Sequence, residues 1–252
     1  YLISAILIAI PYYLSNYQIT LVDSLFEAYS GITGTGFSIF NNVKYLDPTL
    51  IIWRSSSQWI GGLYFLIFLV LFFSNSQFNY KLNDLVFSEK SLNSETNIQK
   101  VSLKVFFLYV LLTSLIFFFF IISEVRLFNG LNLSMTLISA GGFLPANSLQ
   151  QIIRTNTQEF FLIISFLVSI LNFYFVYNAF SKKNFYKEHY EDLSILLLII
   201  VFSGLLLVTL SNLDFFDTII MILTSLGTSG ISLNQTPGNL SLYFLFLTII
   251  GG

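Results

Sequence analysis

Long uncharged runs alternate with short charged segments along this chain. Uncharged runs cover 105–123, 160–181 and 193–213, with lengths of 19, 22 and 21 residues, and another extends from Ser55 through Tyr80. A helix needs about 20 apolar residues to cross the hydrocarbon core of a bilayer, where charge is costly. The runs lack polar alternation and exceed the length of a barrel strand. The pattern therefore predicts membrane-spanning helices.

Three other uncharged segments are apolar but interrupted by glycine, and they cover 28–43, 127–153 and 218–237. Each begins with a helix-like half and continues into a glycine-rich turn. Glycine ends helices readily and permits positive φ. Non-helical backbone at membrane depth is tolerated only where it is buried in protein or lines water. We therefore expect re-entrant loops, in which a short helix enters the membrane and an extended strip returns.

Each interrupted segment lies between two predicted spans, so that one unit recurs three times. We expect the first unit over 1–73, the second over 101–181 and the third over 192–252, with cytoplasmic linkers over 74–100 and 182–191. Each unit contains two crossings, and successive units therefore enter the membrane from the same side. Their strips can then meet on one axis along the membrane normal.

Both chain ends lie within apolar stretches. The first residues are already apolar, without the basic region or the cleavage site of a signal peptide. The last apolar run begins only near Leu240, which leaves about 13 residues, too few to cross lipid. We expect the sequence to be a fragment cut at both ends.

Composition narrows the class of protein. Hydrophobic residues make up 55% of the chain and charged residues 10%, whereas a soluble domain is about one quarter charged. The net charge of −2 gives no field for nucleic acid, and the lack of cysteine excludes disulfides and thiolate metal sites. The composition excludes a soluble globule, a disordered chain and a nucleic-acid binder. It predicts an all-α polytopic membrane protein in contact with lipid.

Basic residues predict the orientation of the chain. The two linkers, with the residues flanking them, carry seven lysines, and the opposite side carries four basic residues. The positive-inside bias places the linkers in the cytoplasm and the glycine strips toward the outside. Trp53 and Trp59, near the outer end of the second span, are typical of an aromatic belt at a membrane interface.

The glycine strips could replace the water shell of a monovalent cation. Backbone carbonyls do this where several narrow strips face one axis, and the C-terminal end of each half-helix adds partial negative charge. A single strip would more often indicate close helix packing, but three at equivalent places favour a pore. The candidate ion-binding residues are Thr33, Gly34, Thr35, Gly36, Ser139, Ala140, Gly141, Gly142, Gly227, Thr228, Ser229 and Gly230.

Four stretches carry a resemblance to a known family. They run from Asp23 to Gly36, from Trp53 to Gly62, from Ser139 to Phe143 and, more loosely, over 227–230. In that order they resemble the first pore loop, the start of the following helix, and the second and third filters of the Trk/Ktr/HKT superfamily of potassium-translocating subunits. The bacterial Trk-type proteins are the most similar. The resemblance covers nearly the whole chain.

This resemblance implies a bacterial inner-membrane subunit for potassium uptake. Family members have four units around one pore, so that three are present here and the chain as given should not conduct on its own. They usually dimerise and bind a cytoplasmic nucleotide-binding regulatory subunit. Glycine at the place of Gly36 is associated with potassium and serine with sodium. The residues at 249–252 resemble the start of a gating loop, whereas Asn172 lies in a stretch where relatives often have smaller residues.

Two charged residues near the first strip admit more than one role. Arg54 could tune ion entry or brace the strip, but we interpret it rather as a snorkelling anchor at the outer edge of a span. Its candidate partners are Asp23, Glu27 and Asp47. Glu27, nine residues before Gly36, could attract cations at the mouth or merely face water.

The main alternative function is a secondary transporter with broken helices and alternating access. Inverted rather than parallel repeats would favour that reading. A membrane enzyme would need clustered His, Asp, Glu or Ser at one membrane face, and the sole histidine, His189, lies in a linker. We therefore expect no enzyme activity and no cofactor, with the potassium ion as the substrate.

Overall fold

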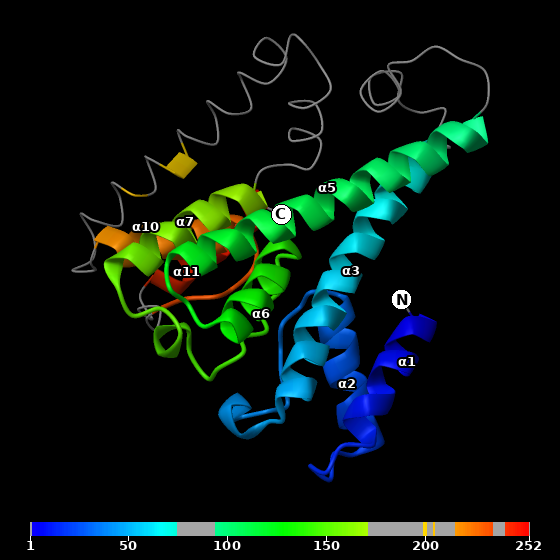
Figure 1. Cartoon of the computed structure of the whole chain (residues 1–252), viewed down its shortest axis with the longest axis horizontal. Coiled ribbons are helices and arrows are strands. Elements are labelled where there is room, and N and C mark those ends of the chain that lie inside the picture. Colours follow the sequence, from blue (N-terminus) through cyan, green and yellow to red (C-terminus); the bar gives the residue numbers. More distant parts are fainter. Residues whose placement is uncertain are drawn as a thin grey trace.

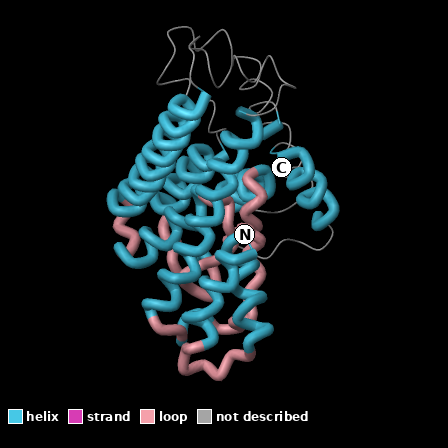
Figure 2. Tube along the Cα trace, turned by 90° about the vertical axis from the view of Figure 1, so that its right-hand side faces the viewer, coloured by secondary structure: helices cyan, strands magenta, loops and turns pink. Residues whose placement is uncertain are grey.

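The computed structural model describes residues 2–74, 94–170, 199–200, 204, 215–233 and 240–251 (Figure 1). Within these ranges the chain is helical, and Figure 2 shows loops but no strand between the helices. The helices are α1 (Leu2–Tyr13), α2 (Leu21–Ile32), η1 (Val43–Tyr45), α3 (Pro48–Ser74), α5 (Ser94–Ile122), α6 (Leu127–Ile138), η2 (Leu149–Gln151), α7 (Asn156–Ile170), α10 (Phe215–Leu226) and α11 (Ser241–Gly251). The all-α prediction is confirmed.

The described helices follow the predicted order of span, half-helix, strip and span. The half-helices α2, α6 and α10 have 12 residues each, and α3, α7 and α11 follow them in turn. α1 precedes α2 and α5 precedes α6. Most of the predicted span over 192–212, most of the predicted linker over 74–100 and all of the linker over 182–191 lie outside the described residues. α5 begins at Ser94, inside the stretch that we expected to be linker.

Among the described residues, Ser102–Ile122 in α5 is long and apolar enough to cross a membrane. Five other apolar helices have between 10 and 17 residues, and they are α1, α6, α7, α10 and α11. Large apolar side chains on α1, α5 and α11 are exposed, among them Ile3, Phe107 and Leu242. Apolar surfaces of this kind on outer helices are suited to lipid contact.

Neighbouring helices bury most of α6 and α10 and the C-terminal end of α2. In α10 every residue from Ile220 to Leu226 is buried, and α6 lies in a core cluster with α5 and α7. In α2 the C-terminal Ile32 is buried, whereas Leu21 and Val22 of the first turn are exposed. The hydroxyl of Thr20, the residue just before α2, accepts a hydrogen bond from the Asp23 backbone N–H at 3.2 Å. Each strip therefore starts from a fixed helix end inside the protein.

The two tryptophans of α3 join helices. Trp53 Nε1 donates a hydrogen bond to the Ile8 carbonyl of α1 at 3.0 Å, and Trp59 Nε1 donates to Thr113 Oγ1 of α5 at 3.0 Å. The Trp59 ring also lies 5.1 Å from the Tyr109 ring, centroid to centroid. Both indole N–H groups therefore have a protein partner, and a place for these residues at a membrane interface stays a prediction.

Candidate ion-conduction site

The three half-helices end in the same hydrogen-bonded turn. The strips cover 33–36, 139–142 and 227–230. In each, the second residue donates its N–H to the carbonyl three residues before it, and the third residue donates to the carbonyl five residues before it. The bonds are Gly34 to Gly31 (3.0 Å), Ala140 to Leu137 (3.1 Å), Thr228 to Ser225 (3.1 Å), Thr35 to Ser30 (3.0 Å), Gly141 to Thr136 (2.9 Å) and Ser229 to Thr224 (3.1 Å). This is the Schellman arrangement of helix C-termini.

The turn requires positive φ at the second strip residue, and only the first strip has glycine there. Gly34 has φ of 70°, whereas Ala140 and Thr228 reach 52° and 53° with a Cβ atom present. Positive φ is a genuine outlier for a β-branched residue such as threonine. The turn therefore forms even where the local sequence disfavours it, because the surrounding packing fixes the helix end.

The strips of the three units meet. A Cβ atom on Gly36 would lie 2.6 Å from the Gly142 Cα atom, and one on Gly142 would lie 3.2 Å from the Ser229 carbonyl oxygen. A Cβ atom on Gly34 would lie 3.6 Å from the Ser139 carbonyl oxygen. Backbones from residues 36, 142 and 229 thus share one small region, although more than 85 residues separate each from the next along the chain.

The strip hydroxyls divide into two groups. Thr33 and Thr35 are exposed, and their Oγ1 atoms lie 2.7 Å apart, while Thr33 Oγ1 also donates to the Tyr29 carbonyl. Thr228 is likewise exposed. Ser229 is buried, and its hydroxyl lies 2.8 Å from Thr224 Oγ1. The three threonine side chains are thus exposed, whereas the Ser229 hydroxyl bonds to the end of the helix before its own strip.

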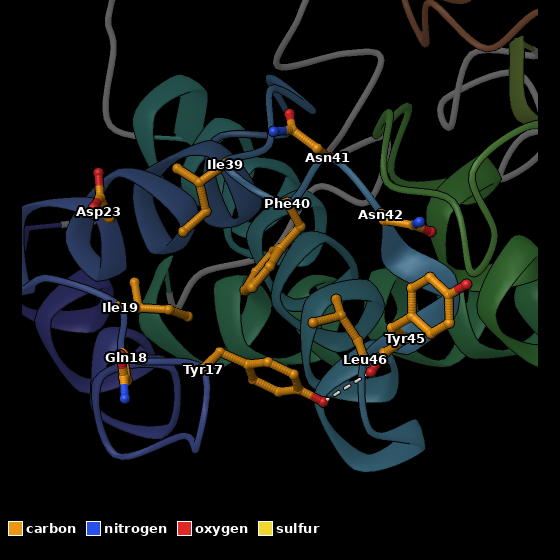
Figure 3. Close-up of a pocket in the computed structure, with 10 residues that line it drawn as sticks. All are labelled: Tyr17, Gln18, Ile19, Asp23, Ile39, Phe40, Asn41, Asn42, Tyr45 and Leu46. Carbon is orange, nitrogen blue, oxygen red and sulfur yellow. Dashed lines mark hydrogen bonds between the residues drawn. The ribbon is translucent and has the colours of Figure 1, made fainter.

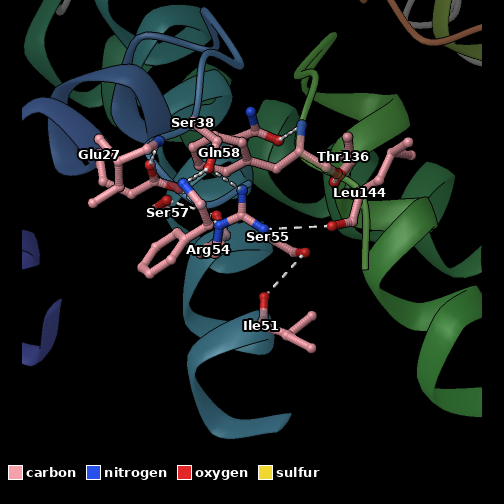
Figure 4. A network of polar contacts seen from close by, with 12 residues as sticks. Glu27, Ser38, Ile51, Arg54, Ser55, Ser57, Gln58, Thr136 and Leu144 are labelled. Carbon is pink, nitrogen blue, oxygen red and sulfur yellow. Dashed lines mark hydrogen bonds and ion pairs between the residues drawn. The ribbon is translucent and has the colours of Figure 1, made fainter. Parts of the chain in front are cut away.

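A buried ion pair stands behind the first strip (Figure 4). Arg54 Nε lies 2.8 Å from Glu27 Oε1, and the two side chains are 2% and 0% exposed. Glu27 also accepts hydrogen bonds from the Ser38 hydroxyl at 3.0 Å and from the Ile39 backbone N–H at 2.9 Å. Glu27 is the partner of Arg54, as one of our alternatives had it. The snorkelling role for Arg54 is wrong, and so are both roles expected of Glu27, because neither side chain reaches water.

Arg54 also connects the first unit to the second. Its Nη2 atom donates to Ser38 Oγ at 2.9 Å and its Nη1 atom to the Leu144 carbonyl at 3.4 Å. The guanidinium carbon lies 4.3 Å from the centre of the Phe143 ring, within the range of a cation–π contact. Arg54 therefore contacts the chain just beyond both the first and the second strip.

Sequence reasoning missed Gln58, one helical turn after Arg54 on α3. Gln58 is fully buried, and its Oε1 atom accepts the Phe143 backbone N–H at 3.2 Å (Figure 4). Its amide also fills the place that a Cβ atom on Gly141 would occupy. The signal available in the sequence was a run of four uncharged polar residues, 55–58, inside a predicted span.

Glycines on α3 and α11 let these helices pack closely against the ends of the half-helices α2 and α10. A Cβ atom on Gly61 of α3 would collide with the Ile32 carbonyl, and one on Gly251 of α11 with the Leu226 carbonyl. These two carbonyls end α2 and α10, so the contact recurs in the first and third units. Close backbone approach of this kind is the usual role of glycine between membrane helices.

The long helix of one unit also packs against the start of the next unit's strip, and this contact occurs twice. In the first case the glycine lies on the helix, and in the second it lies in the strip. A Cβ atom on Gly62 of α3 would lie 2.9 Å from Ser139 Cβ, at the start of the second strip. At the start of the third strip, a Cβ atom on Gly227 would lie 3.2 Å from Ile170 Cγ1 of α7. The bulk of Ile170 is thus accommodated by Gly227. Asn172 lies outside the described residues.

A separate hollow of about 640 Å³ lies in the first unit (Figure 3). Tyr17 Oη donates to the Tyr45 carbonyl at 3.1 Å across it and accepts the Asp47 N–H at 2.7 Å. The hollow contains no strip residue and is therefore distinct from the candidate conduction site. It is lined by Tyr17, Gln18, Ile19, Asp23, Ile39, Phe40, Asn41, Asn42, Tyr45 and Leu46.

Comparison with known protein families identifies the class of protein. The model of the family TrkH, described as a cation transport protein, matches residues 5–245. The chain belongs to the TrkH family of cation transport proteins. It is therefore a membrane protein from a family of transport proteins rather than enzymes, and the resemblance to the Trk/Ktr/HKT superfamily is confirmed.

Individual relatives agree with this assignment. An uncharacterized cation transporter of Methanocaldococcus jannaschii is 26% identical over 266 residues, covering 100% of this chain and 53% of that protein. The Trk system potassium uptake protein TrkH of Halomonas elongata is 19% identical over 247 residues, covering 91% of this chain and 51% of that protein. The chain thus spans about half the length of these relatives.

A solved structure supports the fold. The crystal structure of the potassium transporter TrkH from Vibrio parahaemolyticus superimposes with a TM-score of 0.78 at 18% identity, covering 98% of this chain and 53% of that one. At this identity the match speaks for the architecture. The TrkH-family chain therefore has the helical membrane-transporter fold that its hydrophobic pattern indicated.

Proposed function

We propose that this chain forms three walls of a potassium-uptake pore, in which strip carbonyls replace the water shell of the ion. The observation that carries the proposal is the meeting of Gly36, Gly142 and Ser229 from three separate units. Carbonyl oxygens gathered around one axis are the means by which channels dehydrate a monovalent cation. The proposed ligand set is the twelve strip residues, with the exposed hydroxyls of Thr33, Thr35 and Thr228 as additional oxygen atoms.

Each half-helix contributes to the same electrostatic field. α2, α6 and α10 all end directly at a strip, so that their C-terminal ends point toward the meeting region. The carbonyl end of a helix carries about half a negative charge. Three such ends favour a cation without a carboxylate in the strips.

The first residue after each strip differs in exposure between the units, and this difference supports a fourth unit. Phe143 and Ile231, each the first residue after a strip, are 1% and 2% exposed. Phe143 packs against Arg54 of the preceding unit, and Ile231 clusters with Phe166 of the preceding unit's α7. The equivalent Phe37 is 69% exposed. We propose that a fourth unit, with its own second helix, covers Phe37 and closes the pore.

Potassium is the proposed ion because two relatives are named for potassium and because Gly36 occupies the place associated with it. We further propose a bacterial plasma-membrane location with the linkers in the cytoplasm. A homodimer and a nucleotide-binding regulatory subunit are the proposed partners, since relatives are named as proteins of a Trk system.

A secondary transporter with inverted repeats is the alternative. Equivalent strip positions, such as 36 and 142, lie against each other, and all three half-helices reach the strips through the same type of turn. Units related by rotation about one axis produce this arrangement, whereas inverted repeats would bring opposite chain directions together. The geometry therefore favours the pore.

The test replaces strip glycines in the complete protein. Gly36→Ser and Gly142→Ser should lower the ratio of potassium to sodium uptake in cells that lack their own potassium uptake. Gly204→Ala is the control, since among the described residues its added Cβ atom would have only an ordinary contact, 3.9 Å from Ile222 Cδ1. Membrane abundance is measured by quantitative immunoblot. Unchanged selectivity in both well-expressed strip variants would contradict the proposal.

A further inference from the structure

The chain immediately after the second strip is held at three polar atoms of residues 143 and 144. Gln58 accepts the Phe143 N–H at 3.2 Å, Thr136 Oγ1 donates to the Phe143 carbonyl at 2.9 Å, and Arg54 donates to the Leu144 carbonyl at 3.4 Å. Phe143, Arg54, Gln58 and Thr136 are all at most 2% exposed. These bonds fix the direction in which the chain leaves Gly142.

Two of the three groups belong to the other unit. Arg54 and Gln58 lie four residues apart on α3 and therefore on one face of that helix. The same Arg54 is tied to Glu27 and Ser38, which hold the chain after the first strip. A shift of α3 would thus move the chain after both strips together, at the point where Gly36 and Gly142 touch.

We propose that Arg54 and Gln58 are positioning residues for ion selection, which set the spacing between the first two strips from behind. This inference rests on the proposed pore. Both side chains are buried. They act through residues 143 and 144, and Gln58 also through its contact with Gly141, while the strip carbonyls contact the ion. Selectivity of a carbonyl site depends on the number and placement of its oxygen atoms, so a displaced second strip would discriminate less well.

The amide group of Gln58 has a defined orientation against Phe143 and Gly141. Its Oε1 atom must face Phe143, because an amide nitrogen cannot accept the N–H bond. Nε2 then has no hydrogen-bond partner among the described residues, and it would lie 2.8 Å from a Cβ atom on Gly141. The Phe143 N–H therefore sets the orientation of the Gln58 amide, which gives its oxygen atom a specific role.

The first experiment compares Gln58→Met with Ser55→Ala in the complete protein. Methionine keeps the bulk but removes the acceptor. Ser55 is buried on the same helix, and its hydroxyl donates to the Ile51 carbonyl of that helix. We expect Gln58→Met to lower the ratio of rubidium to sodium uptake, with rubidium standing in for potassium, because a displaced second strip discriminates less well between the two ions. Ser55→Ala should leave the ratio unchanged.

A second pair of variants, at Thr136, tests the positioning role if Gln58→Met does not fold. Thr136→Val removes the bond to the Phe143 carbonyl from the opposite side, and Thr136→Ser keeps a hydroxyl that can form it. We expect Thr136→Val to lower the rubidium-to-sodium ratio and Thr136→Ser to restore it. Loss of protein stability with an unchanged ratio, in whichever variants fold, would overturn the positioning role.

The outcome separates this inference from the pore itself. If Gly36→Ser and Gly142→Ser alter selectivity while Gln58→Met and Thr136→Val do not, the pore stands and the positioning role fails. If the glycine substitutions also leave selectivity unchanged, the proposed conduction path fails instead.

Discussion

A Cβ atom on Gly36 would stand 2.6 Å from the Gly142 Cα atom, so that two backbones from different units touch with no side chain between them. Neither partner can relieve this contact by changing a rotamer, because both sides are main chain. The proximity therefore requires glycine at position 36 for space as well as for its φ of 78°. Gly230, with φ of 64°, has no atom of the described residues within 4 Å of an added Cβ atom.

This difference predicts unequal costs for the same substitution. Gly230→Ala should cost roughly 1–2 kcal/mol, the penalty of left-handed backbone for a residue with Cβ. Gly36→Ala adds a backbone collision and should destabilise the protein more. Thermal unfolding of the purified protein in detergent, followed by size-exclusion chromatography, measures both. Equal losses would show that the strips separate easily at this point.

Thr228 predicts a stabilising substitution. Its φ of 53° is strained for a β-branched residue, and glycine removes that strain at an entropic cost of roughly 0.5–1 kcal/mol. Thr228→Gly should therefore raise the Tm slightly. Thr35→Gly is the matched control, because Thr35 is not among the positive-φ residues and should only lose stability. A lower Tm for Thr228→Gly would mean that its side chain stabilises the turn.

The buried ion pair predicts non-additive losses. Glu27→Gln leaves the Arg54 charge buried without its partner, and removing one member of such a pair costs about 3–5 kcal/mol. Arg54→Met should cost a similar amount, whereas the double substitution should cost less than the sum. A double-mutant cycle on the unfolding free energy measures this coupling. Additive losses would contradict a direct interaction.

Helix packing predicts opposite signs for two glycines. Alanine is favoured over glycine in a helix by about 1 kcal/mol. Gly204→Ala meets only an ordinary contact among the described residues and should therefore be neutral or stabilising. Gly61→Ala should destabilise despite the same helix gain, because its Cβ atom collides with the Ile32 carbonyl. Detergent-phase Tm values for the two variants check the sign. A stabilised Gly61→Ala protein would mean that α3 can move away from α2.

The roles of single residues were harder to predict than the architecture. Glu27 and Arg54 lie 27 positions apart, and nothing in their spacing indicates that α2 and α3 bring them together away from water. The same holds for Trp59, whose partner Thr113 lies 54 residues away on α5. Charge and aromatic patterns indicate membrane depth on average, but they do not reveal a buried partner.

Local chemistry determined the elements of this protein. Uncharged runs specified helices, because lipid leaves backbone groups no other partner, and glycine-containing segments specified where those helices stop. Only the folded chain decided that residues 36, 142 and 229 share one place, that Ala140 and Thr228 adopt glycine-like φ, and that Gln58 supports a strip of another unit. These contacts depend on packing between distant segments, and periodicity and composition describe only neighbours along the chain.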